Sequence, residues 1–245
     1  MRYIDLLEKS SKPTKIIKML HGTGAHSAQE IMRVGFSSSP DWKSYSEYDS
    51  LFLESLEGTY FSDSLEMAVK YAHKVAMDSA DVLAIIEAEV DLYKAVPDED
   101  LILGAIRQAL QSSQNAETFA YNFHHNLAGN QNIQMQLPLL KKLKGAYEKA
   151  IDEDEEDVAK YRKILNKVCH AYAAMVLEPH PVYMDGANSI RLPKGLPAKN
   201  IIAVTSFWID EDWNVTDVSA MKGTAIDEMA LQDAVNSLVD QGLFG

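Results

Sequence analysis

The residues best suited to chemistry lie in three short stretches near the N-terminus: His21-Gly22-Thr23, Tyr60-Phe61-Ser62 and Tyr71. A histidine offers two ring nitrogens for hydrogen bonding, and a neighbouring glycine lets a ligand approach the backbone closely. Two tyrosines could hold a flat ring between their aromatic faces. Taken singly, each feature also has an ordinary structural explanation, such as a turn histidine or a half-buried aromatic. Their order and spacing therefore matter more than any one of them.

Short strands and helices are expected over the first 95 residues. The apolar run at 15–20 predicts a buried strand that ends at His21-Gly22, and 28–34 predicts a helix stopped by Gly35. Residues 37–57 are rich in Ser, Tyr, Asp and Glu, which predicts a long loop with a role in binding. The other elements expected here are a strand at 59–62, a helix at 65–78 and a strand at 82–92.

The pattern changes to helix between 97 and 177, where three or four helices are expected at 98–110, 116–127, 137–151 and 158–175. The last is the clearest, because its apolar side chains recur at steps of three and four and share one face. These side chains are Val158, Tyr161, Leu165, Val168, Tyr172 and Met175. Strands are expected to return at 182–184, 189–192 and 201–209, and the tail after 210 contains a predicted helix at 226–238.

In this order and spacing, the N-terminal motifs resemble the diphtheria-toxin-like branch of the ADP-ribosyltransferase superfamily, which includes the poly(ADP-ribose) polymerases. The resemblance rests on LHGT at 20–23, on Ile31 through Gly35-Phe36, and on GTYFSDSLEMAVKYA at 58–72. The eleven-residue step from Tyr60 to Tyr71 matches the two tyrosines that enclose the nicotinamide ring in that family. The resemblance covers the first 95 residues well and the strands after 180 loosely. It does not cover the helical block or the tail.

This resemblance implies that the chain binds NAD as a substrate. His21 would hydrogen-bond a ribose hydroxyl, and the Gly22 backbone would hold the carboxamide. Tyr60 and Tyr71 would stack on the two faces of the electron-poor nicotinamide. The family often has a hydroxyl residue near Ala68, and alanine there removes one hydrogen bond worth about 0.5–1.5 kcal/mol. The NAD-binding positions implied in this way are His21, Gly22, Thr23, Tyr60, Phe61, Ser62, Ala68 and Tyr71.

The implied reaction is loss of nicotinamide through an oxocarbenium-like transition state, which a nearby carboxylate would stabilise. In the family a glutamate at the start of a late strand has this role, whereas Ser189 stands at the matching position here. Three explanations remain open: Asp185 supplies the carboxylate, the acceptor supplies its own acid, or catalysis is lost and NAD is only bound. The catalytic positions implied are His21, Tyr60, Asp185 and Ser189. Transfer of a single ADP-ribose is favoured over poly(ADP-ribose) synthesis.

Composition limits the partners that can be expected. The chain has 36 acidic and 23 basic residues, a formal net charge of −13. Such a surface repels nucleic-acid phosphates, so a protein acceptor is favoured over a nucleic-acid acceptor. With the single Cys169, no apolar signal segment and no membrane-length apolar run, a cytoplasmic location without a membrane partner is expected. His124 and His125 would diverge on a helix, and no metal site is expected.

Together these features predict an α+β fold with an ADP-ribosyltransferase-like split β-sheet core and a helical insertion. Residues 1–95 and 178–209 would form the NAD-binding core, 96–177 the helical insertion, and 210–245 a C-terminal tail with a helix. The expected function is a NAD-dependent mono-ADP-ribosyltransferase that releases nicotinamide and modifies a macromolecule, preferably a protein. A catalytically degenerate NAD- or ADP-ribose-binding module and a NAD glycohydrolase are the alternatives. A toxin or viral effector role is compatible with the same sequence.

Overall fold

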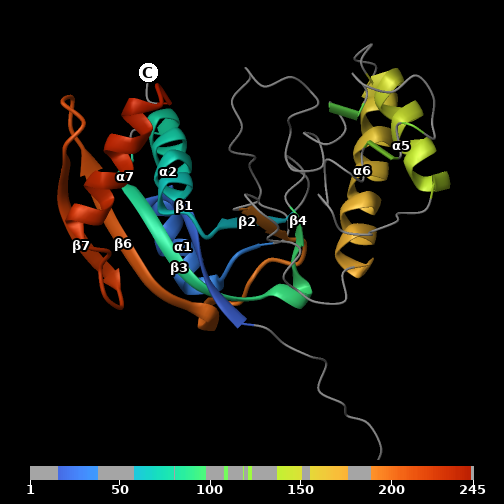
Figure 1. The fold of residues 1–245 in the computed structure, drawn as a ribbon. Helices are drawn as coiled ribbons and strands as arrows, with labels where there is room; N and C mark the ends of the chain where they lie inside the picture. Colours follow the sequence, from blue (N-terminus) through green and yellow to red (C-terminus); the bar gives the residue numbers. More distant parts are fainter. Residues whose placement is uncertain are drawn as a thin grey trace, which may run out of the picture.

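The computed structural model describes residues 16–37, 58–79, 81–97, 137–150, 155–175 and 189–243, with the short pieces 108–109, 118 and 121–122. The predicted strand at 182–184 lies outside this part of the chain, as does the predicted loop at 37–57 apart from its first residue. The described residues form an α+β structure in which one antiparallel sheet carries helices on both faces (Figure 1).

Seven strands form a single sheet in the order β4-β5-β2-β1-β3-β6-β7. Every neighbouring pair in this order is antiparallel. The strands are β1 Ile16–Gly24, β2 Thr59–Ser62, β3 Leu83–Asp91, β4 Val96–Pro97, β5 Ser189–Leu192, β6 Ile201–Ile209 and β7 Val215–Lys222. The nine-residue strands β1, β3 and β6 lie next to one another, and the shorter β2, β5 and β4 extend the sheet beyond β1.

Alternate residues of β3 define the two apolar faces of the sheet. Ala84 and Ile86 belong to one core cluster, which Ala28 of α1 (Ala25–Val34) joins. Leu83 and Ile85 belong to a second cluster on the opposite face, as successive side chains of a strand must. The second cluster contains residues of α2 (Leu65–Ser79) and α7 (Glu228–Asp240). The sheet is therefore covered by α1 on one side, called the α1 side below, and by α2 and α7 on the other, called the α2 side.

Helix α1 is anchored to the start of β3 by a carboxylate from outside the helix. Asp81 accepts hydrogen bonds from the backbone N–H of His26 at 2.9 Å and of Val82 at 2.8 Å. Gly24 precedes the helix and has no side chain with which to cap it, so Asp81 satisfies one of the free N–H groups. At the other end Gly35 adopts φ 86°, a conformation that glycine tolerates, and its N–H bonds the carbonyl of Ile31 at 2.8 Å.

Two boundaries predicted around His21 are wrong. The first strand does not stop before His21 but continues to Gly24, and the following helix begins at Ala25 rather than Ala28. The reason is that β3 pairs with all of β1, from Ile16↔Asp91 to Gly24↔Leu83, and this pairing outweighs the turn preference of two glycines. The His21-Gly22-Thr23 motif therefore lies inside a strand rather than in a turn.

The other core elements confirm the predictions from periodicity. β2, β5 and β6 have the predicted bounds, α2 is one residue longer at its C-terminal end, and β3 is one residue shorter at each end. The C-terminal segment 210–245 was expected to supply a helix, and α7 is that helix. The same segment also supplies β7, which was not predicted and which pairs with β6 as the last strand of the sheet. The segment 210–245 is therefore part of the core, because β7 belongs to the sheet and α7 packs on it.

Helices α5 (Leu137–Ala150) and α6 (Glu155–Met175) confirm the third and fourth helices of the predicted helical block. Four members of the predicted apolar stripe of α6 are buried: Val158, Tyr161, Leu165 and Val168. The side chains of Tyr172 and Met175 lie outside the described part. Tyr147 of α5 meets Tyr161 edge-on, with ring centroids 5.6 Å apart. The helical pieces at 108–109, 118 and 121–122 fall within the first two predicted helices, of which the rest is not described.

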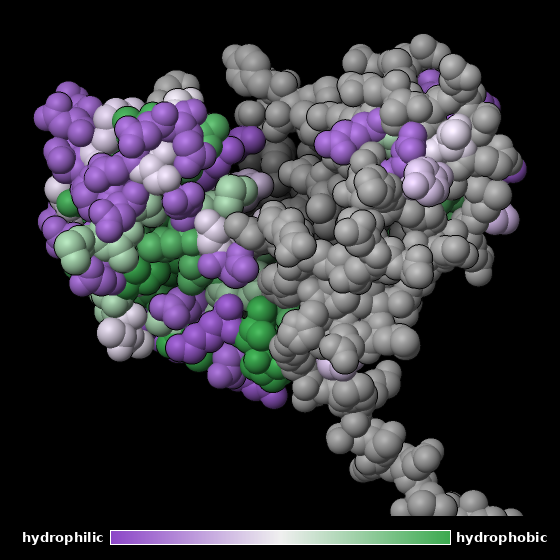
Figure 2. Space-filling view, viewed as in Figure 1, coloured by the Kyte–Doolittle hydropathy of each residue, from purple (hydrophilic) through white to green (hydrophobic). Residues whose placement is uncertain are grey.

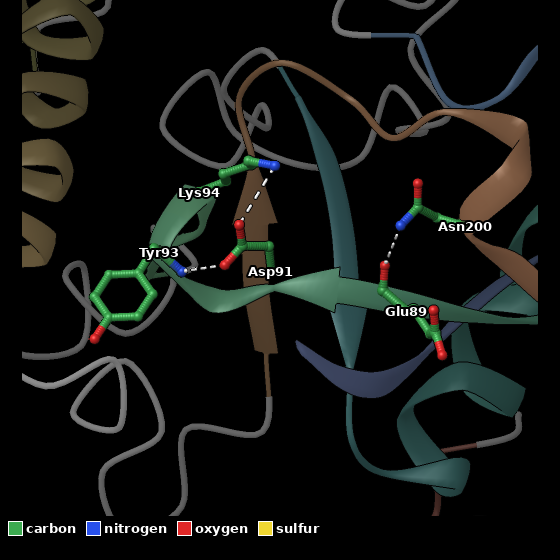
Figure 3. A network of polar contacts seen from close by, with 5 residues as sticks. All are labelled: Glu89, Asp91, Tyr93, Lys94 and Asn200. Carbon is green, nitrogen blue, oxygen red and sulfur yellow. Dashed lines mark hydrogen bonds and ion pairs between the residues drawn. The ribbon is translucent and has the colours of Figure 1, made fainter. Parts of the chain in front are cut away.

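The far end of β3 is held by a small polar network (Figure 3). The carboxylate of Asp91 accepts the backbone N–H of Tyr93 at 3.2 Å and lies 3.3 Å from the Lys94 ammonium. These contacts cap the short helix η1 (Leu92–Lys94). On the same strand, the carbonyl of Glu89 accepts the side-chain amide of Asn200 at 3.2 Å. The network ties β3 to the chain that leaves it and to the turn that enters β6.

The exposed surface is mixed in character. Figure 2 shows hydrophilic residues over much of the part formed by α7 and β7, with a hydrophobic area below them on the same view. Among the helices that the structure describes, none has both the length and the apolar composition that crossing a bilayer requires.

Gly22 is the place where β1 and α2 come closest. An ideal Cβ built on Gly22 would lie 1.9 Å from the carbonyl oxygen of Ala68 and 2.6 Å from the backbone nitrogen of Ala72. Both atoms belong to the backbone of α2 and cannot move without shifting the helix. Glycine at this position is therefore required for the packing of α2 onto the sheet.

We expect Gly22→Ala to lower the free energy of unfolding by about 1–3 kcal/mol, because the added methyl group forces α2 away from β1. Gly145→Ala is the matched control, since a Cβ there meets nothing within 4 Å and lies in the middle of α5. In α5 the same substitution should stabilise the protein by about 0.5–1 kcal/mol. Urea denaturation followed by circular dichroism measures both. Equal effects of the two substitutions would contradict the packing role of Gly22.

Candidate functional site

The His21 ring lies on the α1 side of β1, between two phenylalanines. Its centroid is 4.9 Å from that of Phe36, in an edge-on arrangement, and 5.8 Å from that of Phe61. Phe36 follows α1 and is held in place by two backbone hydrogen bonds with Leu196, at 2.7 and 3.2 Å. Phe61 lies on β2. The ring is thus fixed by residues from three separate parts of the chain.

A hydrogen bond sets the tautomer of His21. Nδ1 lies 2.8 Å from the backbone carbonyl oxygen of Tyr60, and a carbonyl can only accept, so Nδ1 carries the proton and donates. Burial lowers the pKa of His21 below its ordinary value of 6.5, an effect larger than the opposing one of the Tyr60 carbonyl. The neutral ring then presents Nε2 as a hydrogen-bond acceptor, which suits a hydroxyl donor on a ligand.

Strands β1 and β2 separate immediately beyond His21. Their pairing consists of one register pair, Leu20↔Ser62, although β1 continues to Gly24. If the antiparallel pairing continued, Gly22 would stand opposite Tyr60. Instead the imidazole of His21 bonds the Tyr60 carbonyl, which a continued ladder would use for a backbone partner. The hydrogen bond between His21 and Tyr60 thus lies where the pairing of β1 with β2 ends.

Tyr60, Tyr71 and Gly22 share the α2 side of the sheet. Phe61 packs in the α1-side core, so its neighbour Tyr60 points to the other face. Tyr71 lies on α2, three residues after Ala68, whose carbonyl is the backbone atom nearest to Gly22. Both tyrosines are half-buried. Tyr60 and Gly22 therefore face the α2 side, and Tyr71 belongs to the helix that covers that side.

The remaining motif residues have clear structural positions. Thr23 is buried on β1, and Ala68 is buried on the face of α2 that packs on the sheet. Phe61 belongs to the α1-side core. Gly22 was expected to bind a ligand through its backbone. The close packing of α2 against it also explains why glycine is needed at this position.

Two serines stand side by side where a carboxylate was expected. Ser62 on β2 pairs with Ser189 on β5, and Ser62 Oγ accepts the backbone N–H of Ser64 at 3.1 Å. Ile190 and Leu192 pack in the α1-side core, which puts Ser189 on the α2 side with Tyr60 and Ser62. Ser189 is half-buried. Asp185, the other carboxylate candidate, lies outside the described residues.

A carboxyl group that the sequence indicated only as a possible helix cap, together with Ser64, follows the serine pair. Asp63 comes directly after Ser62, between β2 and α2, and partial desolvation raises its pKa above the ordinary 3.8. Sequence spacing carried no signal for it, because an aspartate before a helix is a common capping residue. Ser64 is the residue that caps here, since its Oγ accepts the N–H of Met67 at 3.3 Å.

Arg191 is a second residue that sequence reasoning missed. It stands opposite Tyr60 in the β2–β5 pairing, on the same face, and is only 1% exposed. Its Nη2 donates a hydrogen bond of 2.8 Å to Oδ1 of Asn166 on α6. A charged residue inside a predicted buried strand was the available signal, because an arginine is almost never fully buried without polar partners. Arg191 links the helical block to the strand that carries Ser189.

Tyr60 and Tyr71 belong to the α2 side of the sheet, and aromatic rings of this kind stack on flat ligands. The His21 ring and its nitrogens lie on the α1 side, on the opposite side of the sheet from the two tyrosines. Within the residues described, no group of three or more His, Cys, Asp or Glu side chains is arranged to hold a metal ion.

The lowered pKa of His21 predicts a pH dependence of stability. As pH falls through 6.5, the unfolded chain takes up a proton that the folded chain resists, so stability is present above 6.5 and is lost below it. Burial of His73 acts in the same direction. We expect the free energy of unfolding, measured by urea denaturation, to fall less for His21→Gln than for the wild type when the pH is lowered from about 7.5 to about 5.5. His26→Gln, at an exposed position, is the control, and parallel curves for wild type and His21→Gln would contradict the prediction.

Comparisons of the chain with protein-family models, with curated proteins and with solved structures found no match.

Proposed function

We propose that this protein is a NAD-dependent mono-ADP-ribosyltransferase whose acceptor is another protein. The observation that carries the proposal is the end of the β1–β2 pairing at Leu20↔Ser62, beside which His21 donates a hydrogen bond to the Tyr60 carbonyl. The His21 ring lies on the α1 side and Tyr60, Tyr71 and Ser189 on the α2 side, so NAD would have to span both faces where the two strands separate. In finer detail, we propose that the core is an ADP-ribosyltransferase-like split sheet and that α5 and α6 belong to a helical insertion. The resemblance of LHGT and GTYFS to that superfamily supports the same reading.

Nicotinamide would bind on the α2 side. Tyr60 from the strand and Tyr71 from the helix come from two different elements, as a pair enclosing a flat ring must. Stacking on an aromatic face is worth about 0.5–1.5 kcal/mol beyond the area it buries, and an electron-poor ring gains from it. Ala68 offers no hydroxyl to the carboxamide, so the contact with the amide would depend on backbone groups of the neighbouring strand.

His21 would bind a ribose hydroxyl through Nε2. The hydrogen bond from Nδ1 to the Tyr60 carbonyl fixes the ring orientation and leaves Nε2 as an acceptor. Burial keeps the ring neutral at physiological pH, which preserves that acceptor. In the reaction, the bond between the ribose C1′ and the nicotinamide nitrogen breaks with its electron pair going to the pyridine. A nucleophilic oxygen of the acceptor forms the new bond to C1′ and gives up its proton.

Ser189 accounts for the limited activity proposed. A carboxylate next to the ribose would stabilise the positive charge that develops at C1′, and serine cannot do so. Single transfer at a modest rate is therefore favoured over synthesis of a polymer. Asp185 and a carboxyl group of the acceptor remain the alternative sources of the missing charge.

The second candidate function is a binding module that kept the NAD pocket and lost catalysis. Ser189 is the observation that favours it. An NAD glycohydrolase, in which water takes the place of the acceptor, is the third. The presence of His21, Tyr60 and Tyr71 together argues against a protein that uses only the scaffold, because such a protein has no need of a stacking pair.

The first test is nicotinamide release from NAD by the purified protein, with and without cell lysate. We expect His21→Ala and Tyr71→Ala each to lower release at least about tenfold, because each removes a contact with the reacting half of NAD. Tyr71→Phe keeps the aromatic face and should retain most of the activity. Tyr93→Ala is the matched control, because it makes the same change at an exposed tyrosine in η1, 44% accessible.

The outcomes separate the three candidates. Release that requires lysate and is lost in His21→Ala indicates a transferase, and labelled NAD then marks the acceptor. Release without lysate indicates a glycohydrolase. Binding of NAD without release indicates the degenerate module. If the wild type binds no NAD at all by calorimetry, the proposal is wrong.

The second test restores the missing carboxylate. We expect Ser189→Glu to raise nicotinamide release at least about tenfold, because it places a negative charge beside the developing oxocarbenium ion. Ser189→Gln is the matched control, with the same length and no charge, and should show no increase. A loss of activity in Ser189→Glu, in a variant that keeps the wild-type melting temperature, would count against the placement of the ribose next to β5.

A further inference from the structure

We propose that the exposed lysine face of α6, formed by Lys160, Lys163 and Lys167, docks an acidic segment of the protein acceptor beside the site. This inference rests on the proposed function, because it assigns the surface to the acceptor of that reaction. Its evidence is the charge of α6, the spacing of the three lysines and the contact that joins α6 to β5.

The charge of these helices is opposite to that of the whole chain. The protein has a net charge of −13, yet α5 and α6 together carry eight basic and four acidic side chains, a net of +4. Three of the acids, Glu155, Glu156 and Asp157, occupy the first turn of α6, where they favour the helix dipole. From Val158 to the end of α6 the charged residues are all basic. Hydrophilic residues are prominent on the described part of these helices in Figure 2.

The three lysines form one stripe. Their steps of three and four residues place them on a common face, and all three are exposed. This face is distinct from the buried stripe that contains Tyr161 and Leu165. Within the part of the chain that the structure describes, none of the three makes an ion pair.

The stripe lies next to the residue that joins α6 to the site. Asn166 falls between Lys163 and Lys167, and its Oδ1 accepts the hydrogen bond from Arg191 at 2.8 Å. Arg191 stands opposite Tyr60 and two residues from Ser189, on the α2 side. At about 100° of rotation per residue, Lys163 and Lys167 point about 60° and 100° to one side of Asn166. A chain lying along these lysines would therefore pass close to the face of the sheet that carries Tyr60 and Ser189.

An acidic polypeptide fits this surface better than a nucleic acid does. Three lysines at one helix face match a few carboxylates in a short segment, whereas nucleic-acid binding draws on many phosphate contacts. The net charge of −13 opposes a polyanion over a long range, and a short acidic segment carries less charge for that field to repel. A local cluster of lysines would provide the attraction within a Debye length, about 10 Å at 0.1 M salt.

The test measures binding of a fluorescently labelled glutamate-rich peptide by anisotropy at low salt. We expect the double variant Lys163→Glu/Lys167→Glu to bind about tenfold more weakly, because two attractive charges become repulsive, and added salt should weaken wild-type binding. The matched control is Lys194→Glu/Lys199→Glu, which changes the net charge equally at exposed positions in the β5–β6 connection. That connection packs against Phe36, in the core on the α1 side. The control should bind like the wild type.

A second variant separates docking from positioning. Asn166→Ala removes the acceptor of the Arg191 hydrogen bond and leaves the lysines in place. It should bind the peptide as the wild type does, while labelling of lysate proteins falls relative to nicotinamide release. Melting curves by circular dichroism confirm that each variant is folded.

Each outcome bears on the inference separately from the proposed function. Equal binding by wild type and Lys163→Glu/Lys167→Glu would overturn the docking surface even if NAD is cleaved. Equal weakening in the control pair would do the same, because the effect would then follow net charge alone. Tighter binding of a uridine oligonucleotide than of the peptide, lost in the Lys163/Lys167 variant, would assign the face to nucleic acid and overturn the inference. Peptide binding without any NAD cleavage would instead contradict the proposed function.

Discussion

The close contact between β1 and the backbone of α2 at Gly22 constrains the rest of the site. Because no Cβ intervenes, the backbone of α2 lies directly on β1 at this point. The sheet itself is organised by β3, which pairs with β1 along its full length and with β6 on its other side. β2 is the other neighbour of β1, and its pairing with β1 ends at Leu20↔Ser62, beside the hydrogen bond from His21 to the Tyr60 carbonyl.

The half-buried His21 ring costs free energy to desolvate, and the same surroundings fix its orientation. Desolvation disfavours its charged form, and the rings of Phe36 and Phe61 around it provide that desolvation. The Tyr60 carbonyl satisfies one ring nitrogen, so the polar group is not buried without a partner. The result is a ring with fixed orientation and tautomer at the place where two strands separate. Such preorganisation is what a binding site requires of a hydrogen-bonding residue.

A polar contact joins the helical block to the sheet. Arg191 is buried in β5 and reaches Asn166 on α6, and burying a guanidinium is costly unless its donors are satisfied. That cost favours the observed placement of α6 relative to β5, because sliding the helix would break the hydrogen bond between Arg191 and Asn166. A block of helices attached in this way is suited to presenting a surface next to the strands, rather than to stabilising the core of the sheet.

The local sequence pattern was sufficient to predict the bounds of those elements whose apolar periodicity agrees with their start and stop residues. β2, α2 and α6 were predicted with nearly their observed bounds, and the step from Tyr60 to Tyr71 follows from β2 and α2 alone. The tertiary structure decided what depends on partners distant in sequence. It extended β1 through Gly22 because β3 pairs with it, added β7 because β6 offered a free edge, and buried Arg191 because α6 supplied an acceptor. Strand pairing and buried polar partners are long-range contacts, and no window of neighbouring residues contains them.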